Sequence, residues 1–277
     1  MLATKIKTKG KVLIGKVIIL TEKPYKTILS VFFEQVATQA LFVGRFFKET
    51  FKRPFEFNEI LKQSYLIGYK SLPLVAITGF IMGLVLTIQS RPTLAEFGAQ
   101  SWLPAMVAVS IVREIGPVIT ALIFAGKVGS GIGAELASMK VTEQIDAMEV
   151  AGNNPFKYII VTRVIATSLM LPILTIFNDA IGMLGSFVGV NIDGDVSFHL
   201  YFVQAITELT FMDIFPAVLK TVFFGLSIGL IACYKGYNSN KGTEGVGQAA
   251  NSSVVHASLM IFIIDVIVVR ITSLFIQ

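Results

Sequence analysis

Five charged side chains stand inside long apolar stretches of the sequence, where a charge is costly. They are Arg113, Glu114, Asp179, Lys220 and Asp265. Each costs about 2.5–3.5 kcal/mol on insertion scales if it faces lipid at the bilayer centre. We therefore expect cross-helix pairs, such as Glu114 with Lys220 or Arg113 with Asp265. Such a set forms either the polar part of a transport cavity or a buried salt-bridge network that only fixes helix packing.

Pro117 follows the first two of these charges. A proline has no N–H, so it cannot donate to the carbonyl oxygen four residues earlier, which belongs to Arg113. We expect the helix to bend here and to leave an acceptor that needs a partner or water. A bend of this kind suits a functional segment, although packing alone also accounts for one.

The elements that must position these residues are membrane helices. The chain has 277 residues, of which 54% are hydrophobic and only 15% charged, and its mean hydropathy is +0.73. A helix needs about 20 mostly apolar residues to cross a bilayer. We predict an all-α membrane protein with five transmembrane helices, at about 72–91, 102–127, 158–190, 214–234 and 254–275.

The part of the chain before the first span is more polar. Residues 1–26 are rich in lysine and predict a cytoplasmic segment drawn to anionic lipid. Residues 27–52 have a wide apolar face and a thin charged strip, which is typical of an amphipathic helix lying in the membrane interface. A second polar-faced helix is expected at about 58–70. We therefore divide the chain into N-terminal cytoplasmic and interfacial helices, 1–71, and a transmembrane domain, 72–277.

The distribution of Lys and Arg predicts the orientation. Of 23 such residues, 13 precede Pro73, whereas the linkers at 92–101 and 191–213 contain none. Because basic residues mark the cytoplasmic side, the N-terminus is predicted to be cytoplasmic and, with five spans, the C-terminus to lie on the opposite side. The basic balance of the chain is thereby explained by topology, and we expect no nucleic-acid partner.

The sequence offers little for catalysis or metal binding. Cys233 is the single cysteine, and His199 and His256 are far apart, so no disulfide framework and no metal cluster are expected. The glycines at 126–131 lack the spacing of a phosphate-binding loop. We expect no enzyme activity and no cofactor on this chain; ATP hydrolysis, with its Mg²⁺, would belong to a separate partner.

Four pairs of glycines have the G-x-x-x-G spacing of closely packed membrane helices. They are Gly79/Gly83, Gly129/Gly133, Gly185/Gly189 and Gly225/Gly229. Their recurrence favours a tight bundle or dimer over a loose pore.

A short amphipathic helix is predicted at about 135–150, in a loop on the cytoplasmic side. Leu136, Met139, Ile145 and Met148 form its apolar set, interleaved with Glu135, Lys140, Glu143, Gln144, Asp146 and Glu149. A helix with charges of both signs suits a groove on a soluble partner. The alternative is a loop that rests on lipid headgroups, which fits less well because acidic residues outnumber basic ones.

The stretch from Arg113 to Gly152 also resembles a known signature. It reads REIGPVITALIFAGKVGSGIGAELASMKVTEQIDAMEVAG, which is similar to the motif of the MlaE-type permease family, except that Lys127 stands where Arg is common. Members of this family are membrane subunits of ABC transporters that work with MCE-domain proteins. The resemblance extends from the interfacial helix to the C-terminus.

The resemblance implies both a function and partners. It implies a homodimeric permease in the bacterial inner membrane, with the plastid inner envelope as a second location, that moves phospholipid or a related lipid between inner and outer membranes. Two cytoplasmic ABC ATPase subunits would bind the coupling helix at about 135–150, and an MCE-domain protein would sit on the periplasmic face. The intramembrane polar residues of the family match Arg113, Glu114, Lys220 and Asp265.

Two other classes of function remain open at this point. An ion-coupled secondary transporter would relay protons or Na⁺ through Glu114, Asp179 and Asp265. Such transporters are often built from two inverted halves, and five spans do not divide evenly. A membrane-embedded lipid-modifying enzyme would need a nucleophile, a metal cluster or an acid–base pair, which neither isolated histidine supplies.

Overall fold

The computed structural model describes residues 28–53, 55–192, 194, 196–240 and 242–274, and the predicted lysine-rich segment over 1–26 lies outside this range. Within the described ranges the chain is helical and contains no strand. Five helical stretches are long and apolar enough to cross a membrane: Phe57–Glu96, Gln100–Val141, Phe156–Asn191, Phe211–Tyr237 and Thr243–Ser273. The predicted all-α class and the five spans are confirmed.

The first span is one continuous helix, α3, which runs from Phe57 to Glu96. The predicted polar-faced helix at about 58–70 and the predicted span at 72–91 both lie within α3, which continues through Pro73. The proline removes only the hydrogen bond to the carbonyl of Tyr69. A helix that packs along its length on a neighbour tolerates the loss of one such bond.

The second span is divided into segments. A short 3₁₀ turn, Gln100–Trp102, leads into α4, Leu103–Ser110, α5, Gly116–Phe124, and α6, Ser130–Val141. Two π-helical turns join these segments, at Ile111–Ile115 and Ala125–Gly129. The helical run extends well past the predicted end at 127.

The remaining spans lie near their predicted positions. A π-helical turn at Phe156–Val161 leads into α8, Thr162–Asn191, and α10 and α11 run over Phe211–Tyr237 and Thr243–Ser273. Two short helices, α7 at Gln144–Val150 and α9 at Phe198–Thr207, lie between spans. Helix α9 was not predicted from the sequence. The Ser197 hydroxyl at its N-terminus accepts a hydrogen bond from the amide of Leu200, and a hydroxyl in this position stabilises a helix start.

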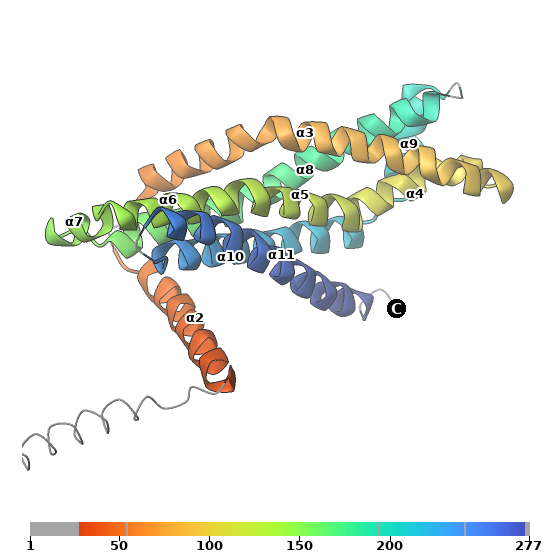
Figure 1. Cartoon of the computed structure of the whole chain (residues 1–277). Helices are drawn as coiled ribbons and strands as arrows, with labels where there is room; N and C mark the ends of the chain where they lie inside the picture. The colour runs from red at the N-terminus through yellow and green to blue at the C-terminus, as the bar shows by residue number, and fades with distance from the viewer. Residues whose placement is uncertain (1–27, 54, 193, 195, 241, 275–277) are drawn as a thin grey trace, which may run out of the picture. The chain divides into compact units, whose positions relative to one another are not determined.

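The long helix α8 packs against both α3 and α10, and α10 packs against α11 (Figure 1). Glycines make the close approaches. A Cβ added at Gly83 would overlap the carbonyl oxygen of Gly182, and one at Gly225 would overlap that of Thr167. The G-x-x-x-G pairs thus meet neighbouring helices of the same chain, in agreement with the tight bundle that their spacing predicted. Thr87 and Ser186 add a buried hydrogen bond of 2.6 Å between α3 and α8.

Helix α2 runs from Ile28 to Thr50. Its location in the membrane interface and the predicted domain boundary at 71 stay predictions. The chain divides after Arg45 into two units, and the site described below lies entirely in the second.

Candidate functional site

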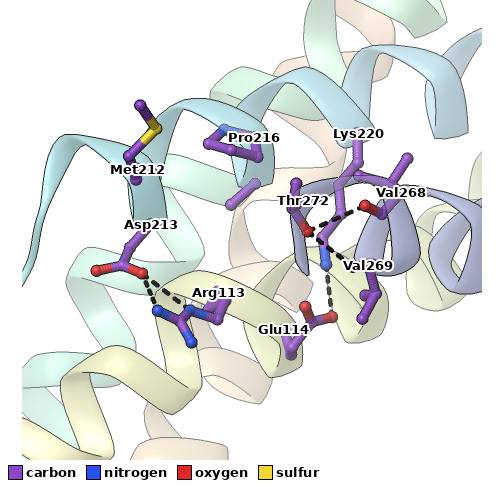
Figure 2. Close-up of a pocket in the computed structure, with 10 residues that line it drawn as sticks. Arg113, Glu114, Met212, Asp213, Pro216, Lys220, Val268, Val269 and Thr272 are labelled. Carbon is purple, nitrogen blue, oxygen red and sulfur yellow. Dashed lines mark hydrogen bonds and ion pairs between the residues drawn. The ribbon is translucent and has the colours of Figure 1, made fainter. Parts of the chain in front are cut away.

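Lys220 of α10 is the centre of a charge cluster within the membrane spans. Its ammonium group lies 2.6 Å from a carboxylate oxygen of Glu114, in the π-helical turn (Figure 2), and 2.9 Å from one of Asp265, in α11. The Lys220 side chain is only 2% exposed, whereas that of Glu114 is 39% exposed. A buried cation is therefore compensated by two carboxylates from two other helices, and the predicted pairing of Glu114 with Lys220 is present.

Arg113 makes a different pair from the one expected. Its guanidinium group donates two hydrogen bonds to the carboxylate of Asp213, one of them at 2.9 Å (Figure 2). The expected pairing with Asp265 was wrong, because Asp265 is held by Lys220. Asp213 also accepts hydrogen bonds from the amide and the hydroxyl of Thr210, at 3.0 and 2.7 Å, which caps the start of α10. This carboxylate is buried and supplies an anion that the sequence analysis assigned to a linker.

The local backbone explains how one turn presents Arg113 and Glu114 to α10. Both residues lie in the π-helical turn Ile111–Ile115, which ends two residues before Pro117. A π-helical turn is wider than an α-helical one and is frequent at functional sites. Pro117 supplies no N–H to this turn, so the regular α-helical ladder is already interrupted there. The predicted bend at Pro117 stays a prediction.

A small polar cleft opens over the charge cluster. Its volume is about 20 Å³, and its lining includes Arg113, Glu114, Asp213 and Lys220 (Figure 2). A larger apolar groove of about 350 Å³ continues from it between α10 and α11. The two share Met212, Pro216, Lys220, Val268 and Thr272. The site thus combines a charged end with an apolar trough, an arrangement that fits an amphipathic ligand.

Asp179 of α8 forms no hydrogen bond or ion pair with this cluster. Its Oδ1 atom is buried and has no hydrogen-bond partner among the described residues. The atom lies so close to Gly116 that a Cβ there would overlap it, so Asp179 packs on the second span directly after the turn that holds Arg113 and Glu114. Of the five predicted intramembrane charges, four therefore lie at the charge cluster, and Asp179 lies apart from them.

The segment predicted as one helix at 135–150 consists of two. Helix α6 ends at Val141, and α7 begins at Gln144 after Glu143 adopts a left-handed conformation with φ 57°. The prediction of one continuous helix was wrong, because a residue in the left-handed backbone conformation ends an α-helix. The acidic and amide side chains of the segment, Glu135, Glu143, Gln144, Asp146 and Glu149, are exposed; Met139, Lys140 and Met148 are partly buried.

Two contacts hold this segment against the bundle. Ile145 of α7 is 4% exposed. The Lys140 ammonium donates to the carbonyl oxygen of Tyr237, at the end of α10, over a distance of 2.8 Å, and also lies over the Tyr237 ring. The acidic residues of α7, Asp146 and Glu149, are exposed.

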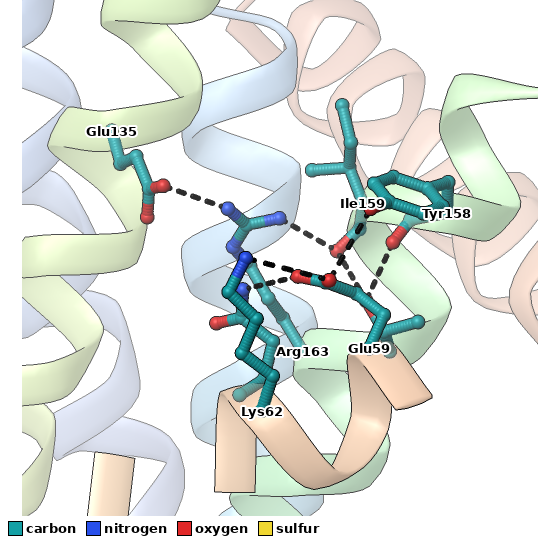
Figure 3. A network of polar contacts seen from close by, with 8 residues as sticks. Glu59, Lys62, Glu135, Tyr158, Ile159 and Arg163 are labelled. Carbon is teal, nitrogen blue, oxygen red and sulfur yellow. Dashed lines mark hydrogen bonds and ion pairs between the residues drawn. The ribbon is translucent and has the colours of Figure 1, made fainter. Parts of the chain in front are cut away.

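Arg163 is a residue that the sequence analysis did not identify. Its side chain is buried in α8 and donates to the carboxylate of Glu135, at 2.8 Å, and to the carbonyl oxygen of Ile159, at 3.1 Å (Figure 3). Nearby, Glu59 of α3 accepts a hydrogen bond from the Tyr158 hydroxyl at 3.2 Å. The first contact ties the end of the second span to the start of the third, and the second ties the start of the third span to α3.

The fold and the site define a multi-pass membrane protein in which a charged cleft continues into an apolar groove. Comparison with known sequences identifies its family. The family model described as "Permease MlaE" matches residues 60–271. The chain therefore belongs to the MlaE permease family.

Curated relatives cover most of the chain. A "probable ABC transporter permease protein" of Rickettsia typhi is 38% identical over 232 residues, which are 84% of this chain and 90% of the relative. The "intermembrane phospholipid transport system permease protein MlaE" of Haemophilus influenzae is 37% identical over 216 residues, 78% of this chain and 83% of that protein. A "probable ABC transporter permease protein" of Synechocystis is 32% identical over 251 residues, 88% and 93% of the two chains.

Proposed function

We propose that this chain is the permease subunit of an ATP-binding cassette transporter that moves phospholipid or a related lipid between the inner and outer membranes of a bacterium. Its family membership and the relatives named as ABC transporter permeases support the transporter class. The name of the Haemophilus influenzae relative supports the lipid substrate. In this proposal the chain sits in the inner membrane with a cytoplasmic N-terminus and a periplasmic C-terminus.

The observation that carries the proposal is the continuity of the charged cleft with the apolar groove. The groove between α10 and α11 has the size and lining for part of an acyl chain. Arg113 is half exposed and uses only part of its guanidinium fork on Asp213. An arginine fork suits the oxygens of a phosphate group, so Arg113 would meet the headgroup while the groove holds a chain.

A second copy of the chain would complete the cavity. The side chains of Arg113 and Glu114 are 46% and 39% exposed in the middle of a membrane span. Charges at this depth are costly in lipid and normally face protein or a water-filled cavity. A homodimer that apposes these faces of two protomers would enclose the clefts and remove the charges from lipid.

The driving force would come from cytoplasmic ATPase subunits that bind α7 and the end of α6. The exposed acidic residues of this segment, Glu143, Asp146 and Glu149, suit a basic groove on the partner. ATP and Mg²⁺ would bind the partner, and the permease would hold no cofactor. A periplasmic MCE-domain protein would receive or deliver the lipid on the opposite face.

Movement of the ATPase could reach the charge cluster through the second span. Helix α6 and the turn that holds Glu114 belong to the same helical run. Arg163 ties Glu135 of α6 to α8, so a displacement of this segment would shift two spans together. The charge cluster would then open or close around the headgroup.

The proposal is tested by reconstituting the chain with its ATPase in vesicles and measuring the movement of a labelled phospholipid. We expect transport only with ATP, and we expect Glu143→Lys and Asp146→Lys to weaken co-purification of the ATPase. Glu208→Lys, an exposed charge reversal in the linker between α9 and α10, is the matched control. ATP-independent transport driven by a proton or Na⁺ gradient would instead support the ion-coupled alternative.

A further inference from the structure

The chain leaves α7 along a fixed path. The amide of Asn153 donates to the carbonyl oxygen of Met148 at 3.0 Å. The amide of Gly152 donates to the carbonyl oxygen of Glu149 at the same distance, and Gly152 has φ 80°. These bonds form a Schellman motif, which ends a helix in a defined backbone conformation. A displacement of α7 is therefore passed on to the next residue, Asn154, and is not absorbed in a loose loop.

Asn154 joins this path to two other elements. Its side-chain amide donates to a carboxylate oxygen of Glu49, in the last turn of α2, at 3.1 Å. Its side-chain oxygen accepts a hydrogen bond of 3.3 Å from the amide of Lys157, in the π-helical turn that begins the third span. The last turn of α2 belongs to the same unit of the fold as the five spans. One side chain thus connects the end of α7, the end of α2 and the start of the third span.

Lys157 makes a second connection to the segment after α2. Its ammonium group donates to the carbonyl oxygen of Lys52 and lies 5.7 Å from the centre of the Phe55 ring. Lys157 is 9% exposed and Glu49 is 7% exposed. Buried charges are costly unless they are paired and hydrogen-bonded, and apolar residues of similar volume often pack as well or better. Two buried charges in one small junction therefore favour a functional connection over simple packing.

The space beside the junction is not filled by side chains. A groove of about 660 Å³ is lined by Met148 of α7, by Glu56, directly before α3, and by Asn154 and Lys157. Because open space does not transmit a displacement, movement of α7 reaches α2 through the bonds of the junction. We propose that Asn154 is a positioning residue for transport, which carries the displacement of α7 by the ATPase to α2. This inference rests on the proposed function.

The test exchanges the donor and the acceptor of the bond between Asn154 and Glu49. Asn154→Asp keeps the oxygen that accepts from the Lys157 amide, but it places a second carboxylate against Glu49, so the link to α2 is lost. A hydrogen bond to a charged group corresponds to a factor of roughly ten or more. In vesicles that contain the ATPase, we expect the labelled phospholipid moved per ATP hydrolysed to fall by about tenfold.

A double variant should restore the connection. When Glu49→Gln is added to Asn154→Asp, the new amide nitrogen donates to the new carboxylate, while the remaining oxygen still accepts from Lys52. We expect most of the lipid-to-ATP ratio to return. Asn153→Asp adds the same charge on the exposed neighbouring residue and is the matched control, which should leave the ratio unchanged.

The outcomes separate this inference from the proposed function. Wild-type transport together with an unchanged ratio in Asn154→Asp, or a double variant that stays as impaired as the single one, would overturn the inference alone. Absence of ATP-driven transport by the wild type would overturn the proposed function and this inference with it.

A distance measurement tests the connection without transport. Spin labels are attached to Lys48→Cys, in the last turn of α2, and Asn153→Cys, because both positions are exposed, whereas the native Cys233 is buried. If the two elements move together, the distance between the labels is the same without nucleotide and with ATP trapped by vanadate, and it changes between these states in Asn154→Asp. A distance that differs between the two states with Asn154 in place would contradict the proposed coupling.

Discussion

Lys220→Met is the substitution that best separates a functional charge cluster from a purely structural one. The ammonium of Lys220 is buried and lies 2.6 and 2.9 Å from oxygens of Glu114 and Asp265. Methionine has a similar length but no charge. The substitution leaves two carboxylates within about 6 Å of each other, with no cation between them.

The expected cost follows from this geometry. At an effective dielectric constant of about 20, two like charges at this separation repel by about 3 kcal/mol. Removing one partner of a fully buried ion pair typically costs about 3–5 kcal/mol. Because the Glu114 side chain is 39% exposed and is partly screened by water, we expect the lower end, about 3 kcal/mol. This is a roughly 100-fold change in the ratio of folded to unfolded protein.

The decisive variant neutralises the whole cluster. In Lys220→Met combined with Glu114→Gln and Asp265→Asn, no unpaired charge remains, and replacement of a complete buried network is often neutral or stabilising. We expect its stability to lie within about 1 kcal/mol of the wild type. If the charges serve transport, this stable variant does not move lipid.

The assay has two parts. Stability is measured as the unfolding equilibrium in mixed micelles with increasing dodecyl sulfate, and function as ATP-dependent movement of labelled phospholipid in vesicles that contain the ATPase. Lys235→Met, near the other end of the same helix and partly exposed, is the matched control and should change stability by less than about 0.5 kcal/mol. Wild-type transport by the neutral triple variant would refute the functional assignment, and an unchanged unfolding curve for Lys220→Met alone would refute the electrostatic reasoning.

Three further substitutions test the positioning elements. Gly83→Leu should destabilise the packing of α3 on α8 by about 1–3 kcal/mol, because its Cβ would overlap backbone atoms of α8. Gly126→Leu is the control, because Gly126 has open space around it, and it should not have this effect. Unfolding curves of the two variants measure the difference. Glu135→Gln should cost at most about 1 kcal/mol of stability, because this partner of Arg163 is 55% exposed, yet it should reduce the lipid moved per ATP hydrolysed in reconstituted vesicles. Glu143→Gly should raise stability by about 1 kcal/mol, because glycine adopts the left-handed conformation without the cost that Glu143 bears, while the β-branched Glu143→Val should lower it; an equal effect of both would contradict the backbone argument.

The sequence predicted the charge cluster well because the energetics are simple. Charges in apolar runs must find partners, and Glu114 and Lys220 do. The partner of Arg113 was missed because Asp213 was assigned to a linker. A signal for it exists: Thr210 and Asp213 have the spacing of a capping box, which marks the start of a helix. Recognition of that box would have placed Asp213 within the first turn of α10.

Other features were not accessible from the sequence, because they depend on packing between helices. Pro73 looks like a helix boundary, and only the packing of α3 on α8 shows that the helix continues through it. The left-handed Glu143 carries no glycine or asparagine signal. The burial of Arg163 beside Glu135 likewise requires that the second and third spans be placed side by side.

The second span connects these observations in physical terms. Glu135 near one end bonds Arg163 of α8, and Glu114 near the middle bonds Lys220 of α10. Two π-helical turns interrupt this span, one of which holds Glu114. A π-helical turn contains one residue more than the α-helical hydrogen-bond pattern requires, so its conversion to α-helix rotates the following segment by about 100°. Such a rotation would withdraw Glu114 from Lys220 without breaking the span. A charge pair that can separate in this way suits a cavity that changes shape better than a network that only fixes packing.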